Sequence, residues 1–208
     1  MKKTMIFSCL VAATLVSGCK NMGGIDTDAL TKSGMSAYKA ATLSDADVKT
    51  LSEQSCAEMD KQNTIAPASS TYAKRLNKIA KALGNNIDGT PVTYKVYMTK
   101  EVNAWAMANG CIRVYSGLMD MMTNNEVEAV LGHEMGHVAL GHSRKAMQTA
   151  YATLAARDAI SASSAAGAQL SQSQLGDLGE NLINSAFSRS QESAADDFSY
   201  DLLKKRNI

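Results

Sequence analysis

Two histidines four positions apart constrain this chain more than any other feature. Around them, Val127, Val130 and Leu131 have the apolar spacing of a helix that packs on a core. On that helix, His133 and His137 are one turn apart along the axis and about 40° apart around it. Both imidazoles can therefore reach one metal ion from the same face of the helix.

A glutamate between the histidines adds catalytic chemistry to this metal-binding geometry. Glu134 directly follows the first histidine, so its carboxylate would lie beside a bound ion rather than on it. There it can accept a proton from an attacking water and pass it to a leaving amine. The HExxH pattern therefore predicts a Zn²⁺ site with His133 and His137 as ligands and Glu134 as the catalytic residue. The alternative is two surface histidines on an amphipathic helix.

The remaining histidine is a poor candidate for the third ligand that catalytic zinc requires. His142 lies five positions after His137, which is about 140° around a continuing helix. We therefore expect His142 to face away from the metal, as a surface or packing residue.

A carboxylate near the end of the chain is the better third ligand. Glu192 follows His137 by 55 residues, enough for a loop and a returning helix, and Asp196 lies one turn further on the same face. Alone, such an acidic pair would be a solvated helix face. With HExxH upstream, it predicts that Glu192 binds zinc and that Asp196 holds the free nitrogen of a histidine ligand, most simply His133.

Hydrophobic periodicity and turn residues predict a mainly helical α+β fold, with the HExxH helix packed beside a small mixed sheet. Asn109-Gly110 is a strong tight-turn signal between two of the strands. The segment 159–173, rich in alanine, serine and glutamine, fits either a loop over the site or a weak helix. Strands are expected at 92–98, 104–108 and 111–115, and helices at 45–62, 70–83, 126–156 (one helix or two abutting ones), 175–187 and 189–205.

The overall charge argues against nucleic acid as a partner. The chain has 21 basic and 20 acidic residues, so it lacks the basic excess that phosphate binding requires. Its hydrophobic fraction of 45% is sufficient for one well-packed domain.

The first residues have the features of an export signal. Lys2 and Lys3 precede an apolar run over 5–16 that is too short to span a bilayer. The small residues before Cys19 resemble a lipobox, which would make this cysteine the lipidated N-terminus of the mature protein. We therefore expect a signal peptide at 1–18, a lipid-anchor tether at 19–43 and a peptidase domain at 44–208. The alternative is an ordinary signal peptide with an incidental cysteine.

Export determines how the remaining cysteines are interpreted. Cys9 would leave with the signal peptide, so Cys56 and Cys111 remain as a pair in an oxidising compartment. The simplest prediction is a disulfide between them, and the alternative is two buried free thiols.

HExxH followed by Glu-x-x-Ala-Asp resembles the gluzincin peptidases of the HtpX and Oma type, metallopeptidase family forty-eight. The stretch Asn103-Ala104-Trp105-Ala106 and the segment 110–118 are similar to that family's Asn-Ala-Phe-Ala and Gly-Leu motifs, and the likeness covers about 43–203. It implies a zincin-like fold. It also implies that substrate binds as an added strand, antiparallel to an exposed edge near 104–115. The simpler interpretation of those residues is ordinary sheet.

The resemblance implies a zinc endopeptidase, with one Zn²⁺ per chain, that clears misfolded or unfolded envelope proteins. Lipoproteins retained in the inner membrane usually carry an aspartate after the lipidated cysteine. Lys20 stands there, which favours the periplasmic face of the outer membrane. Family members also carry a later His-Pro segment and a closing helix, which the sequence does not contain up to Ile208. This departure keeps open a catalytically weak or inactive zinc-binding scaffold as the alternative function.

Overall fold

The computed structural model describes residues 43–158 and 170–208. The predicted signal peptide, Cys19 and nearly all of the predicted tether lie outside the described residues, as does most of the segment 159–173. No helix among the described residues is long and apolar enough to cross a membrane.

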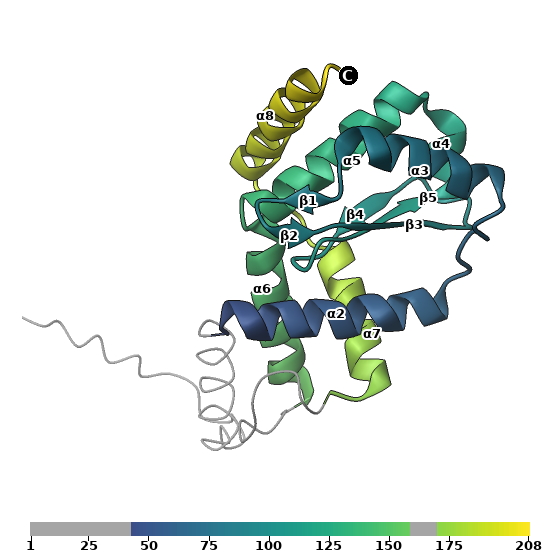
Figure 1. Cartoon of the computed structure of the whole chain (residues 1–208). Helices are drawn as coiled ribbons and strands as arrows, with labels where there is room; N and C mark the ends of the chain where they lie inside the picture. Colours follow the sequence, from purple (N-terminus) through teal and green to yellow (C-terminus); the bar gives the residue numbers. More distant parts are fainter. Residues whose placement is uncertain (1–42, 159–169) are drawn as a thin grey trace, which may run out of the picture.

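A three-stranded mixed sheet lies between two groups of helices (Figure 1). Its central strand, β5 (Cys111–Tyr115), is parallel to β3 (Thr93–Tyr97) and antiparallel to β4 (Ala104–Ala106), which leaves β4 at one edge. The prediction of a mainly helical α+β fold with a small mixed sheet is confirmed, and the short strands fall within the predicted ranges.

Most helices begin where a hydroxyl side chain caps the first turn. Ser44, Ser70, Thr123, Ser171 and Ser188 each accept a hydrogen bond from a backbone N–H of the helix that follows. The helices of the described residues are α2 (Asp45–Gln62), α3 (Thr71–Leu83), α4 (Ser116–Met121), α5 (Asn124–Ala139), α6 (His142–Asp158), α7 (Gln172–Ile183) and α8 (Arg189–Arg206). A small hairpin pairs β1 (Asn86–Ile87) with β2 (Thr90–Pro91).

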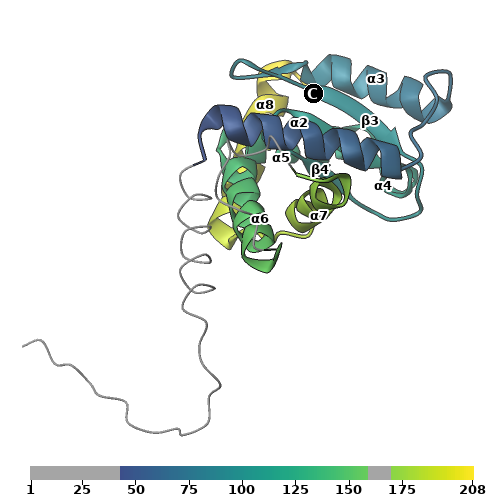
Figure 2. The ribbon, with the colours of Figure 1, turned by 90° about the horizontal axis from the view of Figure 1, so that it is seen from below.

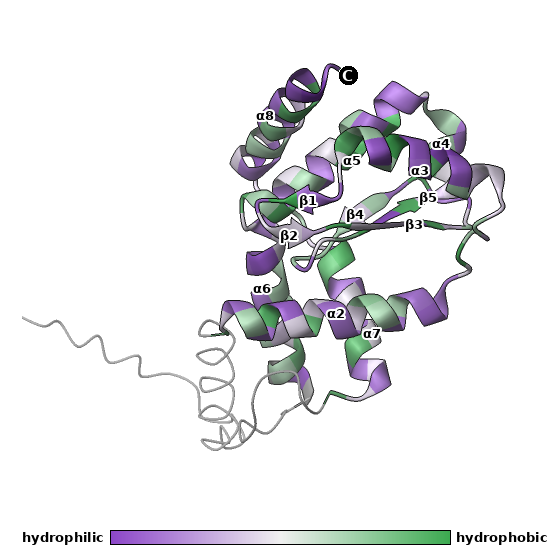
Figure 3. Cartoon of the chain, in the orientation of Figure 1, coloured by the Kyte–Doolittle hydropathy of each residue, from purple (hydrophilic) through white to green (hydrophobic). Residues whose placement is uncertain are grey.

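The central strand is buried on both faces, so it separates two hydrophobic clusters. Ile112 and Val114 pack with α3 and α5 on one side, whereas Cys111 and Tyr115 pack with α2, α6 and α7 on the other. In Figure 3, β5 combines the hydrophobic colour with a hydrophilic stretch, and α3 and α8 carry both hydrophobic and hydrophilic residues. The chain therefore forms three layers, with the sheet in the middle.

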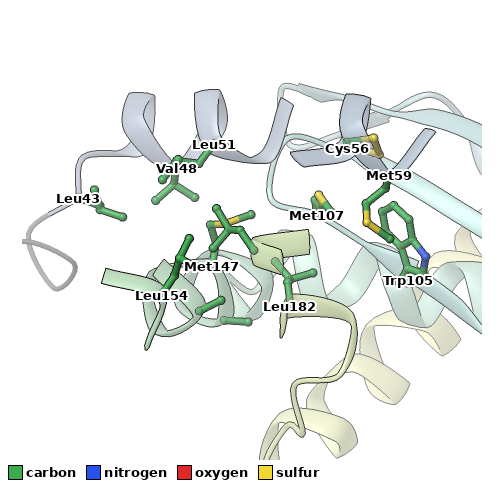
Figure 4. Packing of buried hydrophobic residues seen from close by; sticks show 14 of the residues in the cluster. Leu43, Val48, Leu51, Cys56, Met59, Trp105, Met107, Met147, Leu154 and Leu182 are labelled. Carbon is green, nitrogen blue, oxygen red and sulfur yellow. A yellow bond between two sulfur atoms is a disulfide. The ribbon is translucent and has the colours of Figure 1, made fainter. Parts of the chain in front are cut away.

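The lower layer is built around α2, which lies across α6 and α7 (Figure 2). Val48 and Leu51 of α2 face Met147 and Leu154 of α6 in Figure 4. Leu43, the last residue of the predicted tether, is also buried in this cluster. Leu43, one residue before the Ser44 helix cap, therefore already contributes to the hydrophobic core.

An ion pair between the buried Arg113 and the partly buried Asp60 joins α2 to the sheet. The Nε–H of Arg113 donates to Oδ1 of Asp60 at 2.8 Å, and Nη2 donates to Oδ2 at 3.0 Å. Lys95 and Tyr97 also donate to the Asp60 carboxylate. Burial raises the pKa of Asp60, but the hydrogen bonds from Arg113 and Lys95 outweigh it, so the net pKa lies below its ordinary value. The carboxylate therefore stays ionised and paired where α2 crosses β5.

A disulfide joins the same two elements. The structure links Cys56 of α2 to Cys111 of β5, with Cα atoms 6.6 Å apart. The disulfide is the arrangement expected from the sequence, and it spans 55 positions along the chain.

Candidate metal centre

The helix that carries the two histidines is fixed by its cap and its buried face. Thr123 and Glu126 form a reciprocal capping box at the start of α5. Val127, Leu131 and Met135 are fully buried in the hydrophobic cluster that also contains Ile112 and Val114 of β5. With that face held in the core, the neighbouring face of α5 is presented to α8, which packs along it (Figure 1).

The structure brings the three predicted ligands together. Nε2 of His133 lies 2.9 Å from Nε2 of His137 and 3.3 Å from Oε2 of Glu192, and His137 Nε2 lies 3.9 Å from Glu192 Oε1. Among the described residues, these three form a group whose ligand atoms all lie within 4.8 Å of one another. Tetrahedral zinc with bonds of about 2.0–2.1 Å separates its ligand atoms by about 3.3 Å, so this donor set fits one zinc ion.

The second carboxylate on α8 lies behind the first histidine. Oδ1 of Asp196 is 2.8 Å from Nδ1 of His133, on the side of the ring away from Glu192. This contact has the geometry of a carboxylate that orients a metal-binding imidazole. The function of Asp196 in metal binding stays a prediction.

Glu134 lies next to the ligand group, as the HExxH pattern predicts. Burial raises the pKa of its carboxyl to about 8, the nearby Glu192 carboxylate contributes to the rise, and a hydrogen bond from the Ala106 backbone opposes it. A carboxyl group with a raised pKa is suited to taking up and releasing a proton near neutral pH. A nearby cation would favour its ionised form.

His137 is held in the neutral form. Burial lowers the pKa of this histidine to about 4, and the neighbouring His133 and His142 contribute to the decrease. The ring of Phe187 stacks on it with centroids 3.9 Å apart and an interplanar angle of 19°. A neutral imidazole has the free lone pair that a metal requires.

His142 lies outside the ligand group, as predicted, but the prediction that it faces away from the site is wrong. The helix does not continue past Leu140, because Gly141 takes a left-handed conformation with φ of +73° and α6 starts afresh at His142. The break brings Nδ1 of His142 to 3.0 Å from Nδ1 of His137. Gly141 could have indicated this helix end from the sequence, because glycine commonly ends helices in a left-handed conformation.

Two glycines let α8 approach α5 closely enough to deliver its carboxylates. A Cβ built at Gly132 would lie 2.6 Å from Oγ of Ser199, and one built at Gly136 would lie 3.0 Å from both Cα and the carbonyl oxygen of Ala195. This contact was not predicted from the sequence. The sequence feature that could have indicated it is a glycine directly before each histidine. Glycine inside a helix costs about 1 kcal/mol relative to alanine, so two such glycines point to a close approach of another segment.

Enlarging Gly136 should therefore disrupt the centre. Gly136→Leu places a side chain against the backbone of α8, so we expect the two helices to separate and stability to fall by about 1–3 kcal/mol. Chemical denaturation measures the loss. Asn125→Leu, at an exposed position of the same helix, is the control and should leave stability nearly unchanged. A Gly136→Leu protein as stable as the parent would contradict the close packing.

The predicted substrate strand lies at the edge of the sheet. The residues that flank β4 are both hydrogen-bonded to β5: Asn103, just before the strand, accepts from the Tyr115 N–H, and Met107, just after it, donates to the Cys111 carbonyl. This register turns the backbone groups of Ala104 and Ala106 toward the free edge.

The free edge of β4 reaches the candidate centre at Ala106. Its N–H donates to Glu134, and its carbonyl oxygen accepts a hydrogen bond of 3.1 Å from the buried hydroxyl of Ser143. The side chain of Trp105 packs in the hydrophobic cluster that contains Cys111 and Tyr115, where its ring contacts Tyr97 edge to face. Substrate binding along Asn103, Ala104, Trp105 and Ala106 stays a prediction.

An apolar groove opens beside the centre between α5 and α8. It has a volume of about 410 Å³ and includes His133 and Asp196 in its wall. The rest of its lining is mostly apolar or aromatic: Ala129, Val130, Ser199, Tyr200 and Leu203.

Comparisons with known proteins agree with this geometry. The model of Peptidase family M48 matches residues 70–208. Metalloprotease YcaL of Escherichia coli K12 is 65% identical over the whole chain, which covers 82% of that protein. Metalloprotease LoiP of the same organism is 62% identical over the whole chain, which covers 81% of it. A putative beta-barrel assembly-enhancing protease of Vibrio cholerae is 29% identical over 67% of this chain and 30% of its own length.

Proposed function

The chain belongs to peptidase family M48 and is a metalloendopeptidase, and from that premise we propose that it is a zinc enzyme of the bacterial cell envelope that cleaves unfolded or misfolded proteins. The observation that carries the proposal is the meeting of His133, His137 and Glu192 at one point, with Glu134 directly beside them. These residues come from two helices that are far apart in the sequence, so their meeting is a property of the fold.

The proposed zinc ligands are the two imidazole Nε2 atoms and the Glu192 carboxylate, one ion per chain. When bound, zinc supplies a Lewis acid that lowers the pKa of water and polarises a scissile carbonyl. Asp196 keeps the His133 ring oriented through its Nδ1 atom.

Glu134 is the proposed proton carrier. Its carboxylate accepts a proton as water attacks the scissile carbonyl, and it then donates that proton to the leaving amine. The Ala106 N–H holds the carboxylate in place from the free edge of β4. The proton-transfer group and the proposed substrate strand are therefore joined by one hydrogen bond.

An unfolded polypeptide suits the surroundings of the site. At the free edge, the Ala104 carbonyl oxygen can accept a hydrogen bond from an extended backbone, which only an unfolded or locally unfolded segment offers.

Cleavage of casein, a natively unfolded protein, tests this function. The form that starts after Cys19 would be incubated with zinc, or with a chelator followed by zinc. We expect fragments with zinc, loss of cleavage with chelator and recovery when zinc is restored. Stoichiometric zinc without cleavage would instead support the alternative of a zinc-binding scaffold that holds unfolded proteins.

The proposed location is the periplasmic face of the outer membrane, with the lipid on Cys19. It is supported by the basic start, the apolar run and the small residues before Cys19. The full chain is expected to sediment with outer membranes, and Cys19→Ser to be released in soluble form. Mass spectrometry of the mature N-terminus is the direct check, and an unlipidated Cys19 in the wild-type protein would refute the anchor.

A further inference from the structure

The second proposed ligand, His137, has a partner that the HExxH pattern does not assign. Nδ1 of His137 lies 3.0 Å from Nδ1 of His142. Its other nitrogen, Nε2, faces Nε2 of His133 at 2.9 Å and Oε1 of Glu192 at 3.9 Å. His142 therefore meets the ring nitrogen that stays free when Nε2 binds a metal.

We propose that His142 is a positioning residue for His137: its Nδ1 accepts a hydrogen bond from Nδ1–H of His137. This bond fixes the tautomer in which Nε2 of His137 offers its lone pair to the metal. The inference rests on the proposed zinc site. It gives each ligand histidine its own Nδ1 partner, Asp196 at 2.8 Å for His133 and His142 at 3.0 Å for His137.

The backbone around His142 holds its ring in place. Gly141 breaks the helix with φ of +73°, which turns the next residue back toward α5. Ser143, which is fully buried, anchors the start of α6 by donating from its hydroxyl to the Ala106 carbonyl at 3.1 Å. His142 is thus held in place on both sides, by the turn at Gly141 before it and by the hydrogen bond from Ser143, the residue after it, to the edge strand.

Phe187 cannot replace this function. Its ring stacks on His137 at 3.9 Å and fixes the plane of the imidazole. A 180° flip of the imidazole about its Cβ–Cγ bond would keep the ring plane and the stacking, but it would exchange Nδ1 with a carbon atom. A hydrogen bond at Nδ1 distinguishes the two orientations, and stacking does not. Phe187 therefore fixes the plane of the His137 ring, and His142 fixes which edge of the ring carries Nδ1 on its side.

His142 does not belong to the ligand group itself. Among the described residues, the group that could hold an ion consists of His133, His137 and Glu192. His142 contacts His137 at the nitrogen that does not face the other two ligands. Its proposed effect on the metal is therefore indirect, through the orientation of His137.

Two substitutions separate hydrogen bonding from packing. His142→Phe keeps a ring of similar shape beside Phe187 but removes the acceptor. His142→Asn removes the ring but can place its Oδ1 near the position of Nδ1. We expect zinc affinity, measured by competition with a chromogenic chelator, to fall about 10–100-fold in His142→Phe. We expect His142→Asn to retain most of the affinity.

The Co²⁺-loaded proteins provide a second readout, because the visible absorption of cobalt reports its coordination geometry. His142→Phe is expected to change this spectrum, and His142→Asn to resemble the parent. Lys145→Ala, at an exposed position in the first turn of α6, is the control and should match the parent in both measurements. Melting curves of the metal-free proteins are expected to coincide, which shows that the variants fold.

Three results would overturn the inference. Parent-like affinity in His142→Phe together with weak binding in His142→Asn would identify a packing function. Parent-like affinity in both variants would show that His137 needs no partner at Nδ1. A parent protein that binds no zinc would remove the proposed metal site and this inference together, whereas the first two results leave the metal site intact.

Discussion

Replacing Glu134 with glutamine is expected to lower kcat by about 10²–10⁴-fold while zinc binding is retained. The amide has nearly the same shape as the carboxylate, so the three proposed ligands keep their positions. It cannot accept the proton of an attacking water, however, and water attack then lacks its base. The measurement is turnover of casein or an internally quenched peptide, with zinc content determined on the same sample.

The matched control for Glu134→Gln is Asp197→Asn. It removes an acidic group at an exposed position of α8, next to the residue that contacts His133, without touching the site. It should leave turnover close to that of the parent. Undiminished cleavage by Glu134→Gln would remove this residue from the mechanism. A loss of both zinc and cleavage would show that it supports the fold of the centre instead.

Removing the disulfide is expected to give the largest loss of stability. The bond between Cys56 and Cys111 closes a loop of 55 positions, and in the chain-entropy model such a crosslink stabilises the folded state by about 4 kcal/mol. Without the crosslink, the unfolded chain gains conformational freedom, while the Arg113–Asp60 ion pair is left to hold α2 against β5. The double variant Cys56→Ala/Cys111→Ala, unfolded in urea, measures the difference.

Reduction of the wild-type protein is the control for this variant. If the loss comes from the crosslink, the reduced wild type and the double variant should unfold at similar urea concentrations, both well below the oxidised wild type. The oxidised and reduced wild types would unfold together if Cys56 and Cys111 were two buried free thiols. That result would contradict the crosslink, and a deficit confined to the double variant would point to packing.

Much of the site can be predicted from the sequence because its key relations are local. The spacing of His133 and His137 sets their geometry on any helix, and Glu192 and Asp196 are related in the same way on a second helix. Strand ranges followed alternation and the Asn109-Gly110 turn, and the helices predicted to start at 45, 70 and 189 begin within one residue of those positions. The helix predicted at 175–187 instead spans Gln172–Ile183, because its start is set by the Ser171 cap. A pattern that repeats within one or two turns depends on the backbone geometry of that element, not on its neighbours.

The tertiary structure decided how the elements meet. Gly132 and Gly136 allow α8 to pack closely against α5, and this packing brings Glu192 to the histidines. The position of His142 depended on one backbone angle at Gly141, which reversed the direction predicted from a continuous helix. The link from Glu134 to Ala106 joins a helix to an edge strand. The sequence by itself thus determined which residues could bind a metal. The packing of helices and strands decided which of them meet, because contacts between distant segments depend on close approach and chain direction that no local pattern encodes.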